Sequence, residues 1–163
     1  MPIPAEAIKV TAGSQAILTV GTTEAMAAPG GTDGLVIPLV QDISVSTSPG
    51  TVRYSTLDST SSSAFTTVIE NEVSFNMLLD VDTFFGNASL TNNSVAELGL
   101  FTTSNNKTEV NFSVAFEGAD ASDYYLKGTG FIGGLAPNAS LDQAVWISSG
   151  SIIVNGDLSK DTV

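Results

Sequence analysis

The sequence predicts a mainly β fold, an antiparallel sandwich or partial barrel flanked by one α-helix. Three observations predict it. Apolar and polar residues alternate in several segments, which is the period of a half-buried strand. Turn-forming glycine, proline and asparagine separate these segments, as they do in antiparallel sheets. A single segment carries a helix-start signal followed by apolar residues at helical spacing.

The N-terminal part of the chain contains two predicted strands. Residues 15–20 form a short apolar strand, and residues 35–46 form a long strand whose second half alternates between apolar and polar side chains. Residues 22–34 between them are expected to be a loop, because a proline and three glycines follow closely there. Residues 1–14 precede these elements as an N-terminal arm.

Residues 51–66 are predicted to form a long loop. Ser48-Pro49-Gly50 breaks the preceding strand, and the segment itself has few large apolar side chains. Such a polar segment buries too little surface to offset its loss of conformational entropy. We therefore expect it to be disordered in the free protein and ordered by a neighbouring molecule. Long loops in compact domains are more often functional than idle.

The strand predicted at residues 68–79 has one apolar and one polar face. Asn71 is an exception on the apolar face. One buried and one solvated face is typical of an antiparallel sheet. The apolar face consists of Ile69, Val73, Phe75 and Met77, and the polar face consists of Glu70, Glu72, Ser74 and Asn76.

The helix signal is the capping box Ser94-Val95-Ala96-Glu97, with Leu98 and Phe101 at helical spacing behind it. A start as early as Asp82 is disfavoured, because Gly86 and two asparagines intervene.

Three further strands are predicted after the helix. Residues 109–116 alternate almost perfectly, and residues 123–132 and 144–155 follow as longer apolar segments. Gly133-Gly134 and Pro137 are expected to form the loop between the last two strands. Residues 158–163 remain as a C-terminal tail.

The composition excludes several classes of function. The 163 residues contain no cysteine and no histidine, which excludes thiolate metal sites and both Ser-His-Asp and Cys-His catalysis. Seventeen acidic and five basic residues give a formal net charge of −12, so the surface cannot hold nucleic acid by its phosphates or bind an anionic membrane. No signal peptide and no apolar run of about 20 residues is visible, so we expect synthesis in a cytoplasm.

No motif predicts an enzyme. The glycines of residues 128–133 match the dinucleotide fingerprint, but no helix pattern follows them and no βαβ unit surrounds them. The acidic residues in turns do not have the spacing of a calcium-binding EF-hand. We therefore expect no catalytic residues, no cofactor and no metal.

Several short motifs resemble a known family by their order. Residues 42–50 (DISVSTSPG) look like a strand that enters a long hairpin loop, residues 54–59 (YSTLDS) like a polar motif within it, and residues 71–75 (NEVSF) like the returning strand. In this order the chain resembles the tail tube (major tail) proteins of long-tailed bacteriophages, which are related in fold to the type VI secretion tube protein. The later motifs are the helix, residues 110–116, residues 130–132 and residues 146–155.

The resemblance implies a structural virion protein with one tail-tube domain at residues 1–163, made in the host bacterial cytoplasm and located in the virion tail. Such proteins form hexameric rings in which each subunit gives strands to one barrel around a wide channel. The rings stack into a tube together with a tape-measure protein and with tail terminator and tip proteins, and DNA passes through without specific binding. Residues 51–66 would then contact the next ring through Arg53, Tyr54, Thr56, Leu57 and Asp58.

The resemblance and the alternation together suggest which carboxylates line the channel. We expect some of Glu70, Glu72 and Glu109 to face the lumen, with Asp80 or Asp82 near its rim, because negative walls repel phosphates. A monomeric β-sandwich module, such as a binding domain or a capsid decoration protein, is the alternative. It would share this composition but would be stable alone and would form no tube.

Overall fold

The computed structural model describes residues 16–37, 40–55, 61–116, 124–140 and 143–162. These residues form eight strands and three helices. The strands are β1 (Ile17–Gly21), β2 (Leu35–Val36), β3 (Val40–Tyr54), β4 (Ser63–Leu78), β5 (Glu109–Ala115), β6 (Tyr124–Ser140), β7 (Gln143–Val154) and β8 (Ser159–Thr162). The helices are α1 (Glu24–Ala27), α2 (Val81–Phe85) and α3 (Val95–Asn105).

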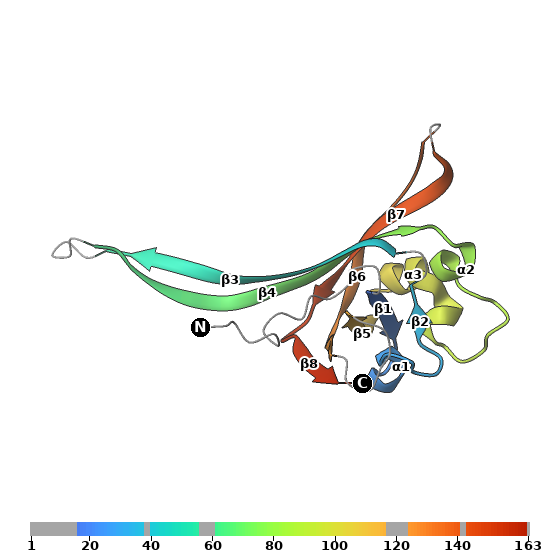
Figure 1. Ribbon diagram of the computed structural model, residues 1–163, viewed down its shortest axis with the longest axis horizontal. Coiled ribbons are helices and arrows are strands. Elements are labelled where there is room, and N and C mark those ends of the chain that lie inside the picture. Colours follow the sequence, from blue (N-terminus) through green and yellow to red (C-terminus); the bar gives the residue numbers. More distant parts are fainter. Residues whose placement is uncertain (1–15, 38–39, 56–60, 117–123, 141–142, 163) are drawn as a thin grey trace, which may run out of the picture.

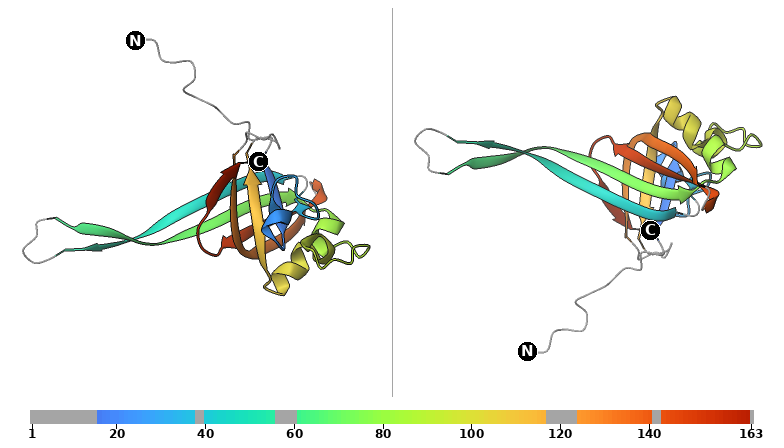
Figure 2. Two further views of the ribbon diagram at one scale, coloured as in Figure 1. Left: turned by 90° about the horizontal axis from the view of Figure 1, so that it is seen from below. Right: turned by 90° about the horizontal axis from the view of Figure 1, so that it is seen from above.

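The described strands form one antiparallel sheet in the order β2-β1-β5-β6-β7-β4-β3, and β8 pairs with β6 beside this path. Figure 1 shows a long hairpin of β3 and β4 that extends away from the rest of the molecule, with α2 and α3 at the opposite end of the longest axis. Figure 2 shows that the remaining sheet curves strongly, so that its strands surround a common interior. The sheet is not a closed barrel, and the predicted mainly β class is confirmed.

The core fills the concave side of this curved sheet. Phe112 and Val73, from strands far apart in the sheet, are both fully buried there. Each such side chain stabilises the fold by roughly 1.5–3 kcal/mol relative to an exposed one. The other core residues come from five strands and from α2 and α3, and include Leu18, Val20, Phe75, Met77, Phe84, Val95, Leu100, Val110, Val114, Ile132 and Ile152. The alternation predicted for β4 is therefore confirmed at Val73, Phe75 and Met77, whereas Ile69 is 46% exposed. The single solvated face predicted for β5 is wrong, because this strand is buried on both faces from Phe112 to Ala115.

The prediction of a long disordered loop at residues 51–66 is wrong for both of its ends. Residues 51–54 complete β3 and residues 63–66 begin β4, with Thr51 opposite Thr66 and Tyr54 opposite Ser63. Pairing along this hairpin satisfies the backbone hydrogen bonds without a core, and its threonines favour extended structure. We call the projecting part, residues 48–54 and 63–70, the arm.

Two further loop predictions are also corrected. Gly133-Gly134 and Pro137 lie within β6, where the pairing with β7 shifts between Gly133 and Ala136. Such a bulge lets a strand continue past residues that usually break it, and Gly134 has a φ of 61° there. The predicted tail at residues 158–163 contains β8, which pairs with β6.

The predicted helix begins where expected, and two short helices accompany it. Ser94 Oγ accepts a hydrogen bond from the Glu97 backbone N–H at 3.2 Å, as a capping box requires. The sequence did not predict α1, and α2 begins near the disfavoured position Asp82. Helices of four and five residues are too short to show a helical period.

Gly99 joins α2 to α3 through a close backbone contact. Its φ of 75° interrupts α3, and a Cβ at this position would lie 2.3 Å from the Gly86 backbone nitrogen. Both the left-handed conformation and the close approach require glycine. This contact holds α2 against α3, and both helices lie at the end of the molecule opposite the arm (Figure 1).

Candidate assembly surfaces

One side of the sheet carries an exposed surface of small polar residues. It covers β3, β4 and β7, on the side opposite the core. We call this surface the polar sheet face. Its polar residues are Asp42, Ser44, Ser46, Ser48, Glu70, Glu72, Ser74, Asn76, Ser149 and Ser151, and the exposed aliphatic Ile153 lies among them opposite Glu72. None of the basic residues that the structure describes belongs to it, so it carries negative charge without a cation.

The three glutamates expected in the lumen lie on the same side of the sheet. Strand register places Glu109, Phe131, Ile153 and Glu72 in one row across β5, β6, β7 and β4. Glu72 and Glu109 are thus three strand spacings, or roughly 14 Å, apart. Glu70 lies two residues before Glu72 on β4, on the same face. The sequence alternation predicted the shared orientation, whereas the common row depends on the register of four strands.

Glu109 and Asp80 also have structural partners. Glu109 Oε1 accepts a hydrogen bond from Asn155 Nδ2 at 2.7 Å. Asp80 caps α2, since its Oδ2 accepts hydrogen bonds from both the backbone N–H and the hydroxyl of Thr83 at 2.9 Å. Asp82 is exposed in the first turn of α2. The two aspartates therefore belong to a helix beyond the end of β4, away from the row of glutamates.

The arm has apolar side chains that are exposed in the described part of the chain. Tyr54 and Phe65 are about half exposed, with their ring centroids 6.1 Å apart, and Val68 is 82% exposed. The predicted contact residues Arg53 and Tyr54 lie at the end of β3, whereas Thr56, Leu57 and Asp58 lie outside the described residues. Sequence reasoning missed Phe65, because residues 51–66 were interpreted as a polar loop. It did not single out Val68, which it placed at the start of the strand predicted at residues 68–79.

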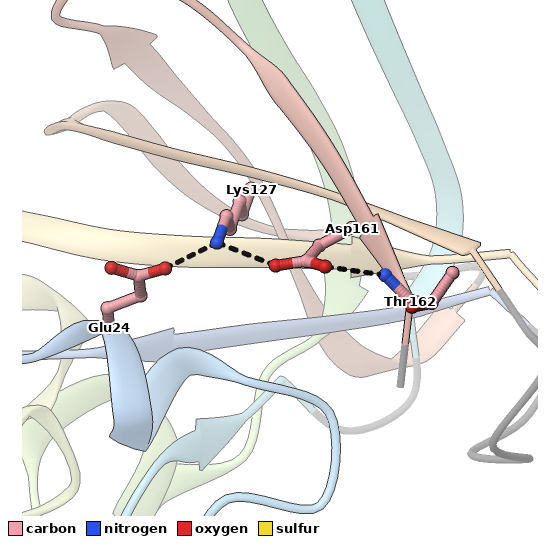
Figure 3. Close-up of polar contacts among 4 residues, drawn as sticks. All are labelled: Glu24, Lys127, Asp161 and Thr162. Atoms are coloured by element: carbon pink, nitrogen blue, oxygen red, sulfur yellow. Dashed lines mark hydrogen bonds and ion pairs between the residues drawn. The ribbon is translucent and has the colours of Figure 1, made fainter.

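A small ion cluster joins α1, β6 and β8 (Figure 3). The Lys127 ammonium contacts the carboxylates of Glu24 and Asp161, and Asp161 also accepts a hydrogen bond from the Thr162 backbone N–H. These bonds hold the pKa of the Asp161 carboxyl below its usual range and raise the pKa of Lys127. No local pattern could predict the cluster, because its members are 34 and 103 residues apart in the sequence.

The cluster predicts an acid-sensitive contact of β8. Because the pKa of Asp161 is lowered by folding, its stabilising effect is present above the unfolded value of about 3.9 and is lost as the pH falls. Lys127 has a raised pKa and stays charged throughout this range. We expect NMR shifts of residues 159–162 to change below about pH 4. Asp161→Asn should show the acid-like shifts at neutral pH, and an unchanged titration in this variant would contradict the assignment.

Neither a metal-binding group nor a membrane-spanning helix is found among the described residues. No three acidic side chains gather there as a group that could hold a metal ion. Within the same residues, no helix has the length and apolar composition needed to cross a bilayer.

Comparison with solved structures identifies the architecture. No protein-family model matches the sequence, and no curated protein matches it significantly. The SPP1 tail tube matches with a TM-score of 0.65 and 12% identity, covering 94% of this chain and 80% of that chain. The tail of an empty gene transfer agent particle, solved with C6 symmetry, matches with a TM-score of 0.63 and 11% identity, covering 94% and 100%.

The chain has the tail-tube fold. A chain of a contractile assembly also matches in fold. That assembly is the sheath–tube complex of the extracellular contractile injection system PVC. That match has a TM-score of 0.57 and 9% identity and covers 98% of this chain and 95% of the other. The tail-tube fold agrees with the family resemblance inferred from the order of motifs. The proteins that share it here are structural parts of tubes rather than enzymes.

Proposed function

We propose that this protein is a tail tube subunit, which forms hexameric rings that stack into the tube through which phage DNA enters the host. The observation that carries the proposal is the arm, a two-stranded projection from a tail-tube fold that exposes aromatic and aliphatic side chains far from the core (Figure 1). An isolated two-stranded hairpin is marginally stable in water. A second subunit that covers the arm would stabilise it and bury these side chains.

The arm suits a contact between successive rings. It extends along the longest axis of the molecule, away from the helices at the other end (Figure 1). A contact between two different surfaces of identical subunits repeats without closing on itself, which is the geometry of a filament or stacked tube. We infer that Arg53 and Tyr54 of β3, together with residues 56–58 between the strands, belong to this inter-ring contact.

The polar sheet face suits the wall of a DNA channel. The four basic residues that the structure describes are Arg53, Lys107, Lys127 and Lys160, and each lies outside this face. A wall of serines, asparagine and glutamates offers no cation to hold a phosphate. We infer that Glu70, Glu72 and Glu109 face the lumen, with Asp80 or Asp82 nearer its rim.

The remaining parts of the proposal concern partners and location. The tube would be assembled in the host bacterial cytoplasm together with a tape-measure protein, and tail terminator and tip proteins would close its ends. The finished subunit would be located in the virion tail. DNA would pass through the channel without sequence-specific contacts. The chain itself would not bind a membrane.

Electron microscopy of the concentrated, purified protein tests the proposal. We expect rings or tubes with a central channel, either spontaneously or after addition of tail-tip complexes as initiators. Exposed apolar side chains on the arm and the low charged fraction of 13% both favour association. A protein that stays monomeric at millimolar concentration, and is absent from purified tails, would instead be the monomeric sandwich module.

A further inference from the structure

A groove opens where the arm separates from the sheet. β4 pairs with β7 from Glu72 to Leu78, whereas the preceding residues of β4 pair with β3 alone. β7 continues through a turn at Gly156 into β8, which pairs with β6. The space between these diverging strands, about 580 Å³, is the fork groove. Its lining combines aliphatic and polar residues, namely Val68, Ile69, Ile153 and Val154 together with Ser46, Ser48, Glu70, Asn71, Glu72, Gly156 and Asp157.

The arm portion of β4 has an unpaired edge beside this groove. Among the described residues, this portion has β3 as its single strand neighbour. Unpaired edges present rows of N–H and C=O groups that accept another strand. The groove is therefore bordered by backbone groups suited to an extended chain.

Aliphatic side chains line both walls. Val68 is 82% exposed and Ile69 is 46% exposed on the arm side, and Ile153 is 58% exposed on the β7 side. Exposed apolar side chains gathered in a groove commonly mark a contact surface. This one is continuous with the arm, because Val68 and Ile69 belong to β4 itself.

Asn71 lies at the branch point with an unsatisfied amide. It is 8% exposed, and its Nδ2 donates a hydrogen bond to the Gly156 carbonyl oxygen at 3.3 Å. That acceptor fixes which end of the amide is nitrogen. Its Oδ1 is buried and has no hydrogen-bond partner in the described part of the chain. Such an orphaned acceptor destabilises a single subunit, and an apolar residue would fit this face of β4 better.

We propose that the fork groove holds an extended segment of a second copy of this chain, and that Asn71 is the polar anchor of that contact. The inference rests on the proposed function and names a surface on which subunits meet. The incoming backbone extends the sheet at the free edge of β4, beside Val68 and Ile153. Because it joins the edge and does not lie over the sheet, Glu70 and Glu72 still project from the sheet face. Rotation of the Asn71 side chain turns Oδ1 toward an incoming N–H, which provides the missing donor. A second copy is the occupant because the groove continues the arm surface that subunits share.

The replacement Asn71→Leu, which keeps the size of the side chain, tests the anchor in the full-length protein. We expect the melting temperature of the unassembled protein to stay equal or rise, because the unsatisfied oxygen is removed. The critical concentration for assembly, measured by sedimentation, should rise on the order of tenfold, the effect of one interface hydrogen bond. The matched control is Asn76→Leu, an exposed position on the opposite face of the same strand.

A second pair of variants keeps the test decisive if Asn71→Leu does not fold. Ile153→Ser removes an exposed aliphatic side chain from the groove but not from the arm, and Val145→Ser removes one from the same strand outside the groove. We expect Ile153→Ser to impair assembly more than Val145→Ser. Assembly of both groove variants at the wild-type concentration, or losses no greater than in their controls, would overturn the inference. Failure of the wild-type protein to assemble would instead reject the proposed function and this contact with it.

Discussion

Replacing residues 50–68 with an Asn-Gly turn is expected to abolish tube formation and leave the subunit folded. Pro49 and Ile69 are directly opposite in the register, so a two-residue turn can connect β3 and β4 there. Among the deleted residues that the structure describes, all but the half-buried Gly50 are exposed, and none belongs to the core. We expect the free energy of unfolding to change by less than about 1 kcal/mol.

Assembly should respond far more strongly, because the deletion removes Val52, Tyr54, Phe65 and Val68 together. The loss of two or more buried interface side chains corresponds to a weakening of more than about 100-fold. Sedimentation and electron microscopy measure this effect, and circular dichroism verifies the fold. The control is the double variant Tyr54→Phe and Phe65→Tyr, which keeps both rings. Tubes of normal length from the shortened protein would contradict the role of the arm.

Charge reversal of the three glutamates that we place in the lumen is expected to make the tube retain DNA. Changing Glu70, Glu72 and Glu109 to lysine alters the formal charge by +2 at each position, from −12 to −6 per subunit. In a ring of six variant subunits, the three lysines of each subunit would surround the channel. They would bind DNA phosphates, with release of counterions. We expect assembled variant tubes to hold short duplex DNA at low salt and to release it as salt rises, and ejection from particles to slow in the same way.

The matched control replaces the same residues with glutamine. It removes the negative charge without adding a cation, and it preserves an acceptor for Asn155 at position 109. The glutamine tubes should therefore assemble and retain little DNA. Equal DNA retention by the lysine and wild-type tubes would place these side chains outside the channel.

The β character of the chain could be predicted because burial leaves a period of two in the sequence. Val73, Phe75 and Met77 on β4 face the core in strict alternation with exposed residues. The capping box at Ser94 was equally local and was found where predicted. Both signals depend on neighbouring residues alone, so no tertiary information is needed.

The arm and the ion cluster could not be predicted for the converse reason. The arm has no buried face, so its strands show no hydrophobic period, and their pairing is visible from the fold alone. Lys127 meets Glu24 and Asp161 through the packing of α1 and β8 against β6. Asn71 stood out in the sequence as a polar exception, but its orphaned oxygen depends on the turn at Gly156.

Cryo-electron microscopy of tubes assembled from the purified protein tests the central claim most directly. The account predicts stacked sixfold rings of this chain, with the arm in contact with the adjacent ring. It also predicts that Glu70, Glu72 and Glu109 face the channel. A reconstruction that places all three glutamates on the outer wall would contradict the lumen assignment. Particles that remain single folded chains at every concentration and with every initiator would contradict the tail tube function itself.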